Sequence, residues 1–90
     1  MSLKRHKQFI KDFKKIQLTD GQFLKLILFI NCLIDDKPLP KESRDHALNG
    51  EYADCREFHI GGDTLVIYLV AETDVTLLRI GSHAQLFRSM

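Results

Sequence analysis

The sequence predicts an α+β fold in which two N-terminal helices pack on a small antiparallel sheet of three to four strands. Apolar residues recur at helical spacing up to residue 34, whereas they alternate with a period of two after residue 54. The connections between the later apolar segments are short enough for hairpins. Ninety residues suffice for one domain only, so we expect a single domain over residues 1–90.

The two helices are predicted from apolar periodicity and from their end signals. The first should cover about residues 7–16, because its phenylalanines and isoleucines share one face and its lysines occupy the other. The second should begin after Thr19, which forms a capping-box pattern with Gln22 three residues later. It should run through Ile34, because two prolines follow within six residues.

The strands are expected after a long polar loop over residues 41–54. Three segments have strand-like patterns, namely Cys55–Ile60, Thr64–Ala71 and Val75–Ile80. The middle segment is apolar on both faces, so it should be the central strand. Ser2–Arg5 would supply the fourth strand, a short one at an edge.

The sequence favours a cytoplasmic protein that does not enter a membrane. Its longest apolar stretch covers only residues 23–34, whereas a bilayer span needs about 20 residues. The basic N-terminus leads into no uninterrupted apolar segment, so we expect no signal peptide. Cys32 and Cys55 lack a C-x-x-C spacing and are typical of reduced thiols, with a disulfide or a metal site as the alternatives.

Positive charge is concentrated at the N-terminus, although the net charge is only +1. Residues 1–16 contain six basic side chains and one acidic side chain, and the rest of the chain carries a net charge of −4. Such a basic arm favours a nucleic-acid partner, and the alternative is a solvated lysine-rich helix face. The candidate RNA-binding residues of this arm are Lys4, Arg5, Lys7, Lys11, Lys14 and Lys15.

Histidines and carboxylates gather in the second half of the chain. Glu57 and His59 should share a face of their strand, because side chains two positions apart point the same way. Arg79 and His83 should also share a face if the last strand continues in extended form. The loop and hairpin residues that could converge on the same surface are His46 and Asp63.

Such a set of side chains suits the cleavage of an RNA phosphodiester bond without a metal ion. One group must remove the 2′-hydroxyl proton, a second must protonate the leaving 5′-oxygen, and a cation must stabilise charge on the phosphate. Histidine serves as base or acid near neutral pH, and arginine presents a planar fork to phosphate oxygens. We expect His59 to be the base, with Asp63 or His46 as its helper, and His83 to be the acid.

Other interpretations of the histidines stay open. Each histidine taken alone could be a surface or hydrogen-bonded structural residue. A zinc site made by His46, His59 and His83 is a further alternative, but their spacings of 13 and 24 match no standard zinc signature. The sequence contains no nucleophile elbow, no P-loop and no dinucleotide-binding fingerprint.

Three motifs occur in order along the second half of the chain. They are D-H-x-L-x-G at Asp45–Gly50, R-E-x-H-x-x-x-D at Arg56–Asp63, and R-x-G-[ST]-H-x-x-L-F at Arg79–Phe87. In this combination the chain resembles the YafQ-type toxins of the RelE/ParE superfamily, which are the ribonucleases of bacterial type II toxin–antitoxin modules. The resemblance covers essentially the whole chain, including Phe9 and Lys11 of the first helix.

This resemblance implies a RelE-like fold and an endoribonuclease that cleaves mRNA in the ribosomal A site without a metal or cofactor, and so inhibits translation. It also implies a cognate antitoxin that neutralises the toxin and supplies the contact with operator DNA. The positions that match the catalytic residues of these toxins are His46, Glu57, His59, Asp63, His83 and Phe87, with Arg79 as the phosphate-side cation and Arg56 as a further RNA-binding residue.

Two other functions remain open within the same fold. One is a ParE-like toxin without enzymatic activity that binds DNA gyrase, and the other is an inactive module that only binds its partner. His46, His59 and His83 together favour the ribonuclease, because a gyrase-binding protein does not need all three.

Overall fold

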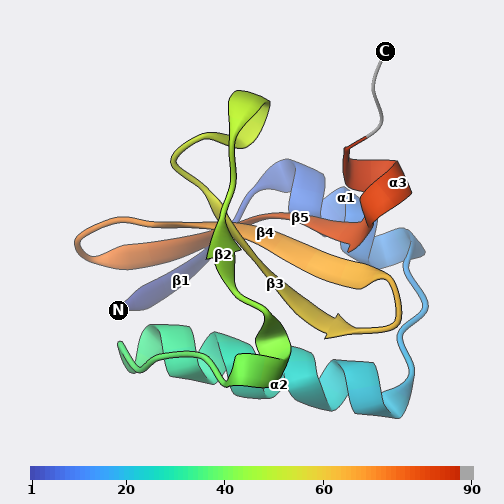
Figure 1. Ribbon diagram of the computed structural model, residues 1–90, viewed down its shortest axis with the longest axis horizontal. Coiled ribbons are helices and arrows are strands. Elements are labelled where there is room, and N and C mark those ends of the chain that lie inside the picture. Colours follow the sequence, from blue (N-terminus) through green and yellow to red (C-terminus); the bar gives the residue numbers. More distant parts are fainter. Residues whose placement is uncertain (88–90) are drawn as a thin grey trace.

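The computed structural model describes residues 1–87 as a five-stranded mixed sheet with three α-helices and two short 3-10 helices (Figure 1). In chain order the elements are β1 (Ser2–Arg5), α1 (Lys7–Lys15), α2 (Asp20–Ile34), the 3-10 helix η1 (Lys41–Ser43), β2 (His46–Ala47), the 3-10 helix η2 (Gly50–Tyr52), β3 (Arg56–Gly61), β4 (Thr64–Val70), β5 (Asp74–Ser82) and α3 (His83–Leu86).

The strands of the sheet lie in the order β1-β5-β4-β3-β2. β1 runs parallel to β5, and the other neighbouring strands are antiparallel. Four consecutive residues of β4, Leu65 to Tyr68, are buried, so β4 is buried on both faces. The prediction of a central strand in this segment is therefore confirmed.

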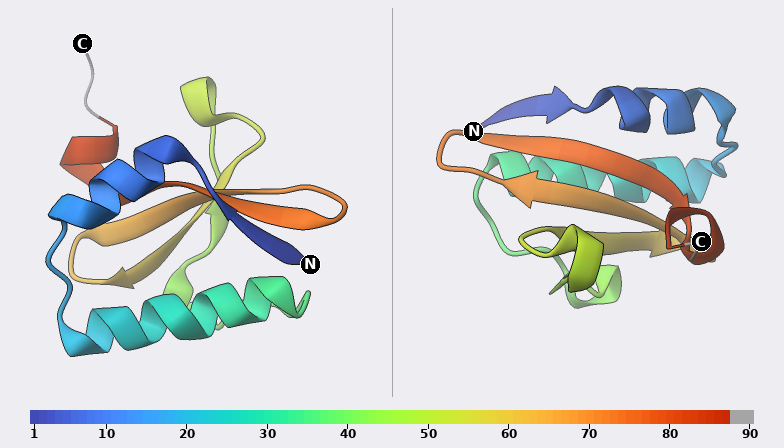
Figure 2. Two further views of the ribbon diagram at one scale, coloured as in Figure 1. Left: turned by 180° about the vertical axis from the view of Figure 1, so that it is seen from behind. Right: turned by 90° about the horizontal axis from the view of Figure 1, so that it is seen from above.

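The two N-terminal helices share one hydrophobic core with the sheet. α2 lies across one face of the sheet, whereas α1 flanks β5 beyond the end of β1 (Figure 2). Phe9 of α1 and Phe29 of α2 are buried in this core, where the Phe29 ring meets the Phe58 ring edge-on. The opposite face of the sheet carries a smaller cluster that includes Leu65, Ile67 and Leu86 of α3.

The predicted α+β class is confirmed, but the predicted numbers of strands and helices were wrong. The sheet has five strands rather than three to four, and it is mixed because β1 pairs in parallel with β5. The strand at Ser2–Arg5 is present at an edge, as expected. β2 has only two residues, which is too short for any alternation to show in the sequence.

The C-terminal end of the last strand also differs from the prediction. β5 ends at Ser82, and His83 is the first residue of α3, so Arg79 and His83 do not share a strand face. Ser82 and Gln85 form a complete capping box, in which each backbone N–H donates to the other side chain. The S-x-x-Q spacing was therefore the sequence signal for this helix.

The first turn of α2 is hydrogen-bonded to the β3–β4 hairpin, which contains Asp63. Thr19 and Gln22 form the expected capping box, and the Gln22 side chain also donates a hydrogen bond to the carbonyl oxygen of Gly61 at 3.0 Å. Gly61 and Gly62 have φ of 115° and 59°, values that favour glycine. The β3–β4 hairpin is thus fixed to α2 next to the site described below.

The outer face of α2 is apolar and exposed. Phe23, Leu24, Ile27 and Leu28 are each about half exposed, whereas Leu26 and Phe29 face the core. Within residues 1–87, no helix has both the length and the apolar character needed to cross a membrane. Cys32 and Cys55 are free and half-buried.

An ion pair joins α1 to the edge of β5. Arg79 donates from Nε and Nη2 to the two carboxylate oxygens of Asp12, at 2.7 and 3.1 Å, and the backbone N–H of Ile80 donates to the same carboxylate. Burial acts to raise the pKa of Asp12, but these hydrogen bonds and the charge of Arg79 outweigh burial, so the pKa lies below its ordinary value of 3.8. Asp12 therefore stabilises the fold in its ionised form.

Asp12→Asn should lower the free energy of unfolding near neutral pH by about 2 kcal/mol, which in a domain of this size lowers Tm by roughly 10 °C. Because the pKa of Asp12 is lower in the folded state, its stabilisation is present above pH 3.8 and is lost as the pH falls through the folded-state pKa. Thermal unfolding should therefore show a wild-type advantage that shrinks in acid. Glu72→Gln, in the exposed β4–β5 turn, is the control and should change Tm little. A difference in Tm between wild type and Asp12→Asn that does not depend on pH would contradict the role of ionised Asp12.

Candidate active site

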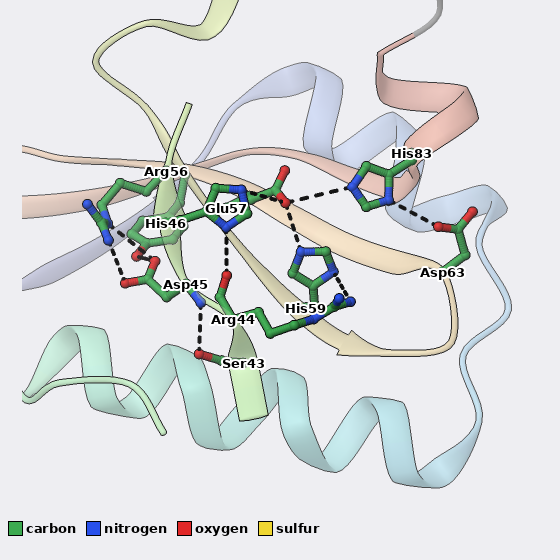
Figure 3. Close-up of polar contacts among 10 residues, drawn as sticks. Ser43, Arg44, Asp45, His46, Arg56, Glu57, His59, Asp63 and His83 are labelled. Carbon is green, nitrogen blue, oxygen red and sulfur yellow. Dashed lines mark hydrogen bonds and ion pairs between the residues drawn. The ribbon is translucent and has the colours of Figure 1, made fainter. Parts of the chain in front are cut away.

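Three histidines surround one buried carboxylate oxygen (Figure 3). Glu57 is 2% exposed, and its Oε2 lies 2.8 Å from Nε2 of His59. The same oxygen lies 3.2 Å from Nε2 of His46 and 3.8 Å from Nε2 of His83. The cluster therefore combines β2, β3 and α3 on the face of the sheet opposite to α2.

Strand geometry explains how these side chains meet. Alternation along β3 directs Glu57 and His59 to the same face, as predicted. His46 is the direct partner of Glu57 in the β2–β3 pairing, so its ring lies beside the carboxylate. His83 arrives from the first turn of α3, because the chain turns away from the sheet after Ser82.

His83 is held from the side away from Glu57. Its Nδ1 lies 3.1 Å from Oδ1 of Asp63, in the hairpin between β3 and β4. Phe87 lies against the His83 ring with centroids 5.7 Å apart, and it also meets Tyr52 edge-on. When Nδ1–H donates to Asp63, the ring presents Nε2 toward Glu57, and about half of the His83 side chain remains exposed.

His46 is held in the same way by the backbone. Its Nδ1 lies 2.7 Å from the carbonyl oxygen of Arg44, which can only accept, so Nδ1 carries a proton. Nε2 is then the nitrogen that faces Glu57, and the side chain is 53% exposed. His46 and His83 thus both present Nε2 at the surface beside the same carboxylate.

His59 differs from the other two histidines. It is buried, and both ring nitrogens have partners, namely Glu57 at Nε2 and the guanidinium of Arg44 at Nδ1, 3.0 Å away. Because arginine only donates, Nδ1 accepts and Nε2–H donates to Glu57. Burial lowers the pKa of His59, and the charges of Arg44 and His83 add to this effect against the opposing effect of Glu57. His59 therefore has no free nitrogen for a substrate proton, contrary to its expected role as the base.

Arg44 is a residue of the cluster that the sequence reasoning missed. Arg44 directly precedes Asp45 and His46 in the sequence, and this adjacency was the available signal that a cation lies near His46. Its backbone holds His46 and its side chain holds His59.

Arg79, expected in the catalytic cluster, and Arg56, expected to bind RNA, both pair with aspartates. Arg79 forms its bidentate ion pair with Asp12, and no hydrogen bond or ion pair within residues 1–87 links it to the histidines. Arg56 points to the other face of the sheet, because alternation separates it from Glu57, and it donates there to both oxygens of Asp45. Arg79 therefore does not bind the histidines as expected, whereas the RNA-binding role of Arg56 stays a prediction.

Asp45 anchors the segment that carries His46. Besides binding Arg56, its carboxylate accepts a short hydrogen bond from the hydroxyl of Tyr68 in the core. Burial and the negative charge of Asp45 raise the pKa of Tyr68 far above its ordinary value, so the hydroxyl keeps its proton and donates. The hydrogen bond from Tyr68 therefore fixes the backbone of residues 44–46 against the core on the α2 side of the sheet.

The side chains of the basic arm are exposed on β1 and α1. Lys4 forms an ion pair with Asp74 at 3.3 Å. Lys15 lines a hollow of about 270 Å³ together with Gln85 and Leu86 of α3. The C-terminal end of α1 therefore lies near the helix that begins with His83.

The cluster has the composition of a transition-metal site. Ligand atoms of His46, Glu57 and His59 lie within 4.8 Å of one another. Imidazole and carboxylate groups suit Zn²⁺ and Cu²⁺. This set differs from the zinc alternative considered above, in which His83 stood in place of Glu57.

The chain matches, over residues 1–88, a family model described as the bacterial toxin of a type II toxin–antitoxin system, YafQ. This chain belongs to the YafQ family of toxins. An mRNA interferase toxin YafQ of Escherichia coli is 33% identical over 81 residues, which cover 89% of this chain and 88% of that protein. A YafQ-type protein of Haemophilus influenzae is 40% identical over 65 residues, which cover 69% of this chain and 64% of that protein.

Solved structures of YafQ and of a toxin from Helicobacter pylori have the same fold. YafQ of Escherichia coli gives a TM-score of 0.84 at 30% identity, covering 96% of this chain and 97% of that one. YafQ in the DinJ–YafQ complex gives 0.82 at 31% identity, with coverage of 96% and 97%. A copper-bound mutant toxin from Helicobacter pylori gives 0.81 at 38% identity, with coverage of 96% and 98%.

Proposed function

We propose that this YafQ-family toxin is an endoribonuclease that cleaves ribosome-bound mRNA by general acid–base catalysis and so inhibits translation. The observation that carries the proposal is the pair of exposed histidines, His46 and His83, which present Nε2 on either side of buried Glu57. The description of the Escherichia coli relative as an mRNA interferase supports the same activity.

In the proposed reaction, Nε2 of His46 removes the proton from the ribose 2′-hydroxyl. The 2′-oxygen then attacks the adjacent phosphorus, and the bond from phosphorus to the 5′-oxygen breaks. Nε2 of His83 donates a proton to that leaving oxygen, which yields a 2′,3′-cyclic phosphate and a 5′-hydroxyl end. We assign the acid role to His83, because Asp63 accepts its Nδ1–H and so leaves Nε2 to face the substrate.

The remaining residues of the cluster orient these two histidines. Glu57 accepts from His59 and faces both catalytic rings, so it fixes their separation. We assign His59 a positioning role in place of the expected base, because it is buried with both nitrogens occupied. Phe87, about one-third exposed against His83, can hold that ring and stack on a base.

The test is cleavage of a synthetic mRNA by the purified chain, both on programmed ribosomes and as free RNA. We expect cleavage on the ribosome with cyclic-phosphate and 5′-hydroxyl ends, because the 2′-oxygen is the nucleophile. A chelator selective for transition metals should leave the rate on ribosomes unchanged. Intact mRNA together with accumulated gyrase–DNA cleavage complexes would instead favour the ParE-like function. If neither mRNA cleavage nor such complexes are observed, the inactive partner-binding module is the remaining function.

A bound transition metal would act against this chemistry. His46, Glu57 and His59 would hold such an ion, which would supply Lewis acidity and would occupy the His46 ring that the proposed mechanism uses as the base. We therefore infer that Cu²⁺ or Zn²⁺ inhibits cleavage. The copper-bound relative from Helicobacter pylori is consistent with an affinity of this kind.

We also propose that a cognate antitoxin neutralises this chain, as supported by the DinJ–YafQ complex of its relative. The exposed lysines of β1 and α1 would attract acidic segments of such a partner. The exposed apolar face of α2, described above, is suited to an apolar segment of it. Contact with operator DNA would then come through the antitoxin.

A further inference from the structure

The turn that carries Arg44 is held in an unusual conformation. Arg44 has φ of 49° and ψ of 39°, a left-handed backbone that costs free energy in any residue except glycine. Its N–H donates to the carbonyl oxygen of Lys41. Buried Ser43 donates from its hydroxyl to Pro40 and accepts from the N–H of Asp45. The surrounding hydrogen bonds therefore impose this conformation on a residue that does not favour it.

The conformation places a permanent positive charge in the histidine cluster. Figure 3 shows the Arg44 side chain running along the cluster to His59, whose Nδ1 lies 3.0 Å from Nη2. Histidines change charge with pH, whereas a guanidinium does not. Within residues 1–87, no other arginine or lysine has a hydrogen bond or ion pair with His46, Glu57, His59 or His83.

The charge of Arg44 is also available to an anion. Arg56 and Arg79 are each neutralised by a bidentate aspartate, namely Asp45 and Asp12. Arg44 has no carboxylate partner among the described residues, and its one side-chain contact is a neutral ring nitrogen. Arg44 is an exposed residue, and its one side-chain hydrogen bond leaves four of its five N–H donors without a partner among the described residues.

We propose that Arg44 is a catalytic residue that binds a non-bridging oxygen of the scissile phosphate, in the role expected of Arg79. This inference rests on the proposed ribonuclease function. Attack by the 2′-oxygen adds negative charge to the phosphate oxygens, and a fixed donor at that position stabilises the transition state more than the ground state. The contact with His59 holds the guanidinium in place before RNA binds.

The experiment measures single-turnover cleavage of an mRNA with one phosphorothioate at the cleaved linkage, on programmed ribosomes. Wild-type protein should cleave one of the two sulfur diastereomers more slowly, because sulfur weakens the contact with the guanidinium. Arg44→Ala should cleave the ordinary substrate about 10²-fold more slowly and should no longer distinguish the diastereomers. Arg44→Lys should retain part of both effects, because it keeps the charge and loses the fork.

Three further variants separate this role from others. Arg44→Gly relieves the left-handed backbone but loses the hydrogen bond to His59, so its Tm should fall less than that of Arg44→Ala while cleavage is lost to the same extent. Lys41→Ala removes an exposed cation from the same turn and should leave the rate unchanged. Arg79→Ala should lower Tm and keep the distinction between diastereomers.

The outcomes that would overturn the inference differ from those that would overturn the function. If Arg44→Ala keeps the wild-type distinction, Arg44 acts only through His59 or not at all. If Arg79→Ala alone abolishes the distinction, Arg79 holds the phosphate. If the wild-type protein cleaves no RNA, the proposed ribonuclease function is wrong and this inference is wrong with it.

Discussion

His83→Ala should slow RNA cleavage by about 10²–10⁴-fold, because a general acid contributes a factor of that size. Its ring is half exposed and is oriented by Asp63 and Phe87, so its loss removes a proton donor without opening the core. A substrate with a 5′-thio leaving group needs no acid. It should therefore restore the rate of His83→Ala, but not that of His46→Ala, in a single-turnover assay.

His6→Ala is the matched control for this experiment. His6 caps α1, because its Nδ1 accepts a hydrogen bond from the backbone N–H of Gln8. Its removal should lower stability by about 1 kcal/mol and leave cleavage unchanged. Rescue of His46→Ala by the thio substrate would reverse the two roles, and full activity of both variants would end the proposed mechanism.

Glu57→Gln should reduce kcat on the order of 10⁴-fold, comparable with the loss of a carboxylate that orients a catalytic histidine. The amide oxygen can still accept from His59, but it carries no charge and so cannot stabilise the His46 ring after that ring takes up the substrate proton. KM should change little, because a side chain that is 2% exposed does not touch RNA. Steady-state cleavage of mRNA on ribosomes separates kcat from KM.

Glu42→Gln is the control, since Glu42 is an exposed residue of η1 that forms an ion pair with Lys25. It should cleave like the wild type. Glu57→Ala should additionally lose stability, by about 2–3 kcal/mol, because it leaves the buried Nε2–H of His59 without an acceptor. A change in KM alone for Glu57→Gln would show that the carboxylate contributes to binding rather than to orientation of the histidines.

Local patterns in the sequence were sufficient for much of the fold. The α1 and α2 helices and the β3–β4–β5 meander follow from periodicity and turn residues, which act over a few neighbouring positions. β1 and β2 depend on their partners instead. The side chains of β1 are exposed, and this strand forms because its backbone pairs with β5, about 70 residues away. The two residues of β2 form a strand only because their backbone pairs with β3.

The composition of the histidine cluster was also readable in the sequence, since alternation on β3 joins Glu57 and His59 and the motifs supply His46, Asp63 and His83. The positions of the cations were not. Arg79 and Arg44 differ in whether a carboxylate from a distant element lies beside them, and Asp12 reaches Arg79 only because α1 packs against β5. Likewise, burial of His59 between Glu57 and Arg44 arises from the meeting of β2, β3 and the η1 turn.

Sequence patterns thus determined which ionisable groups are present and which strand face they share. Charge pairing and solvent exposure, which decide what each group can do, depend on contacts between distant segments and were decided by the tertiary structure alone.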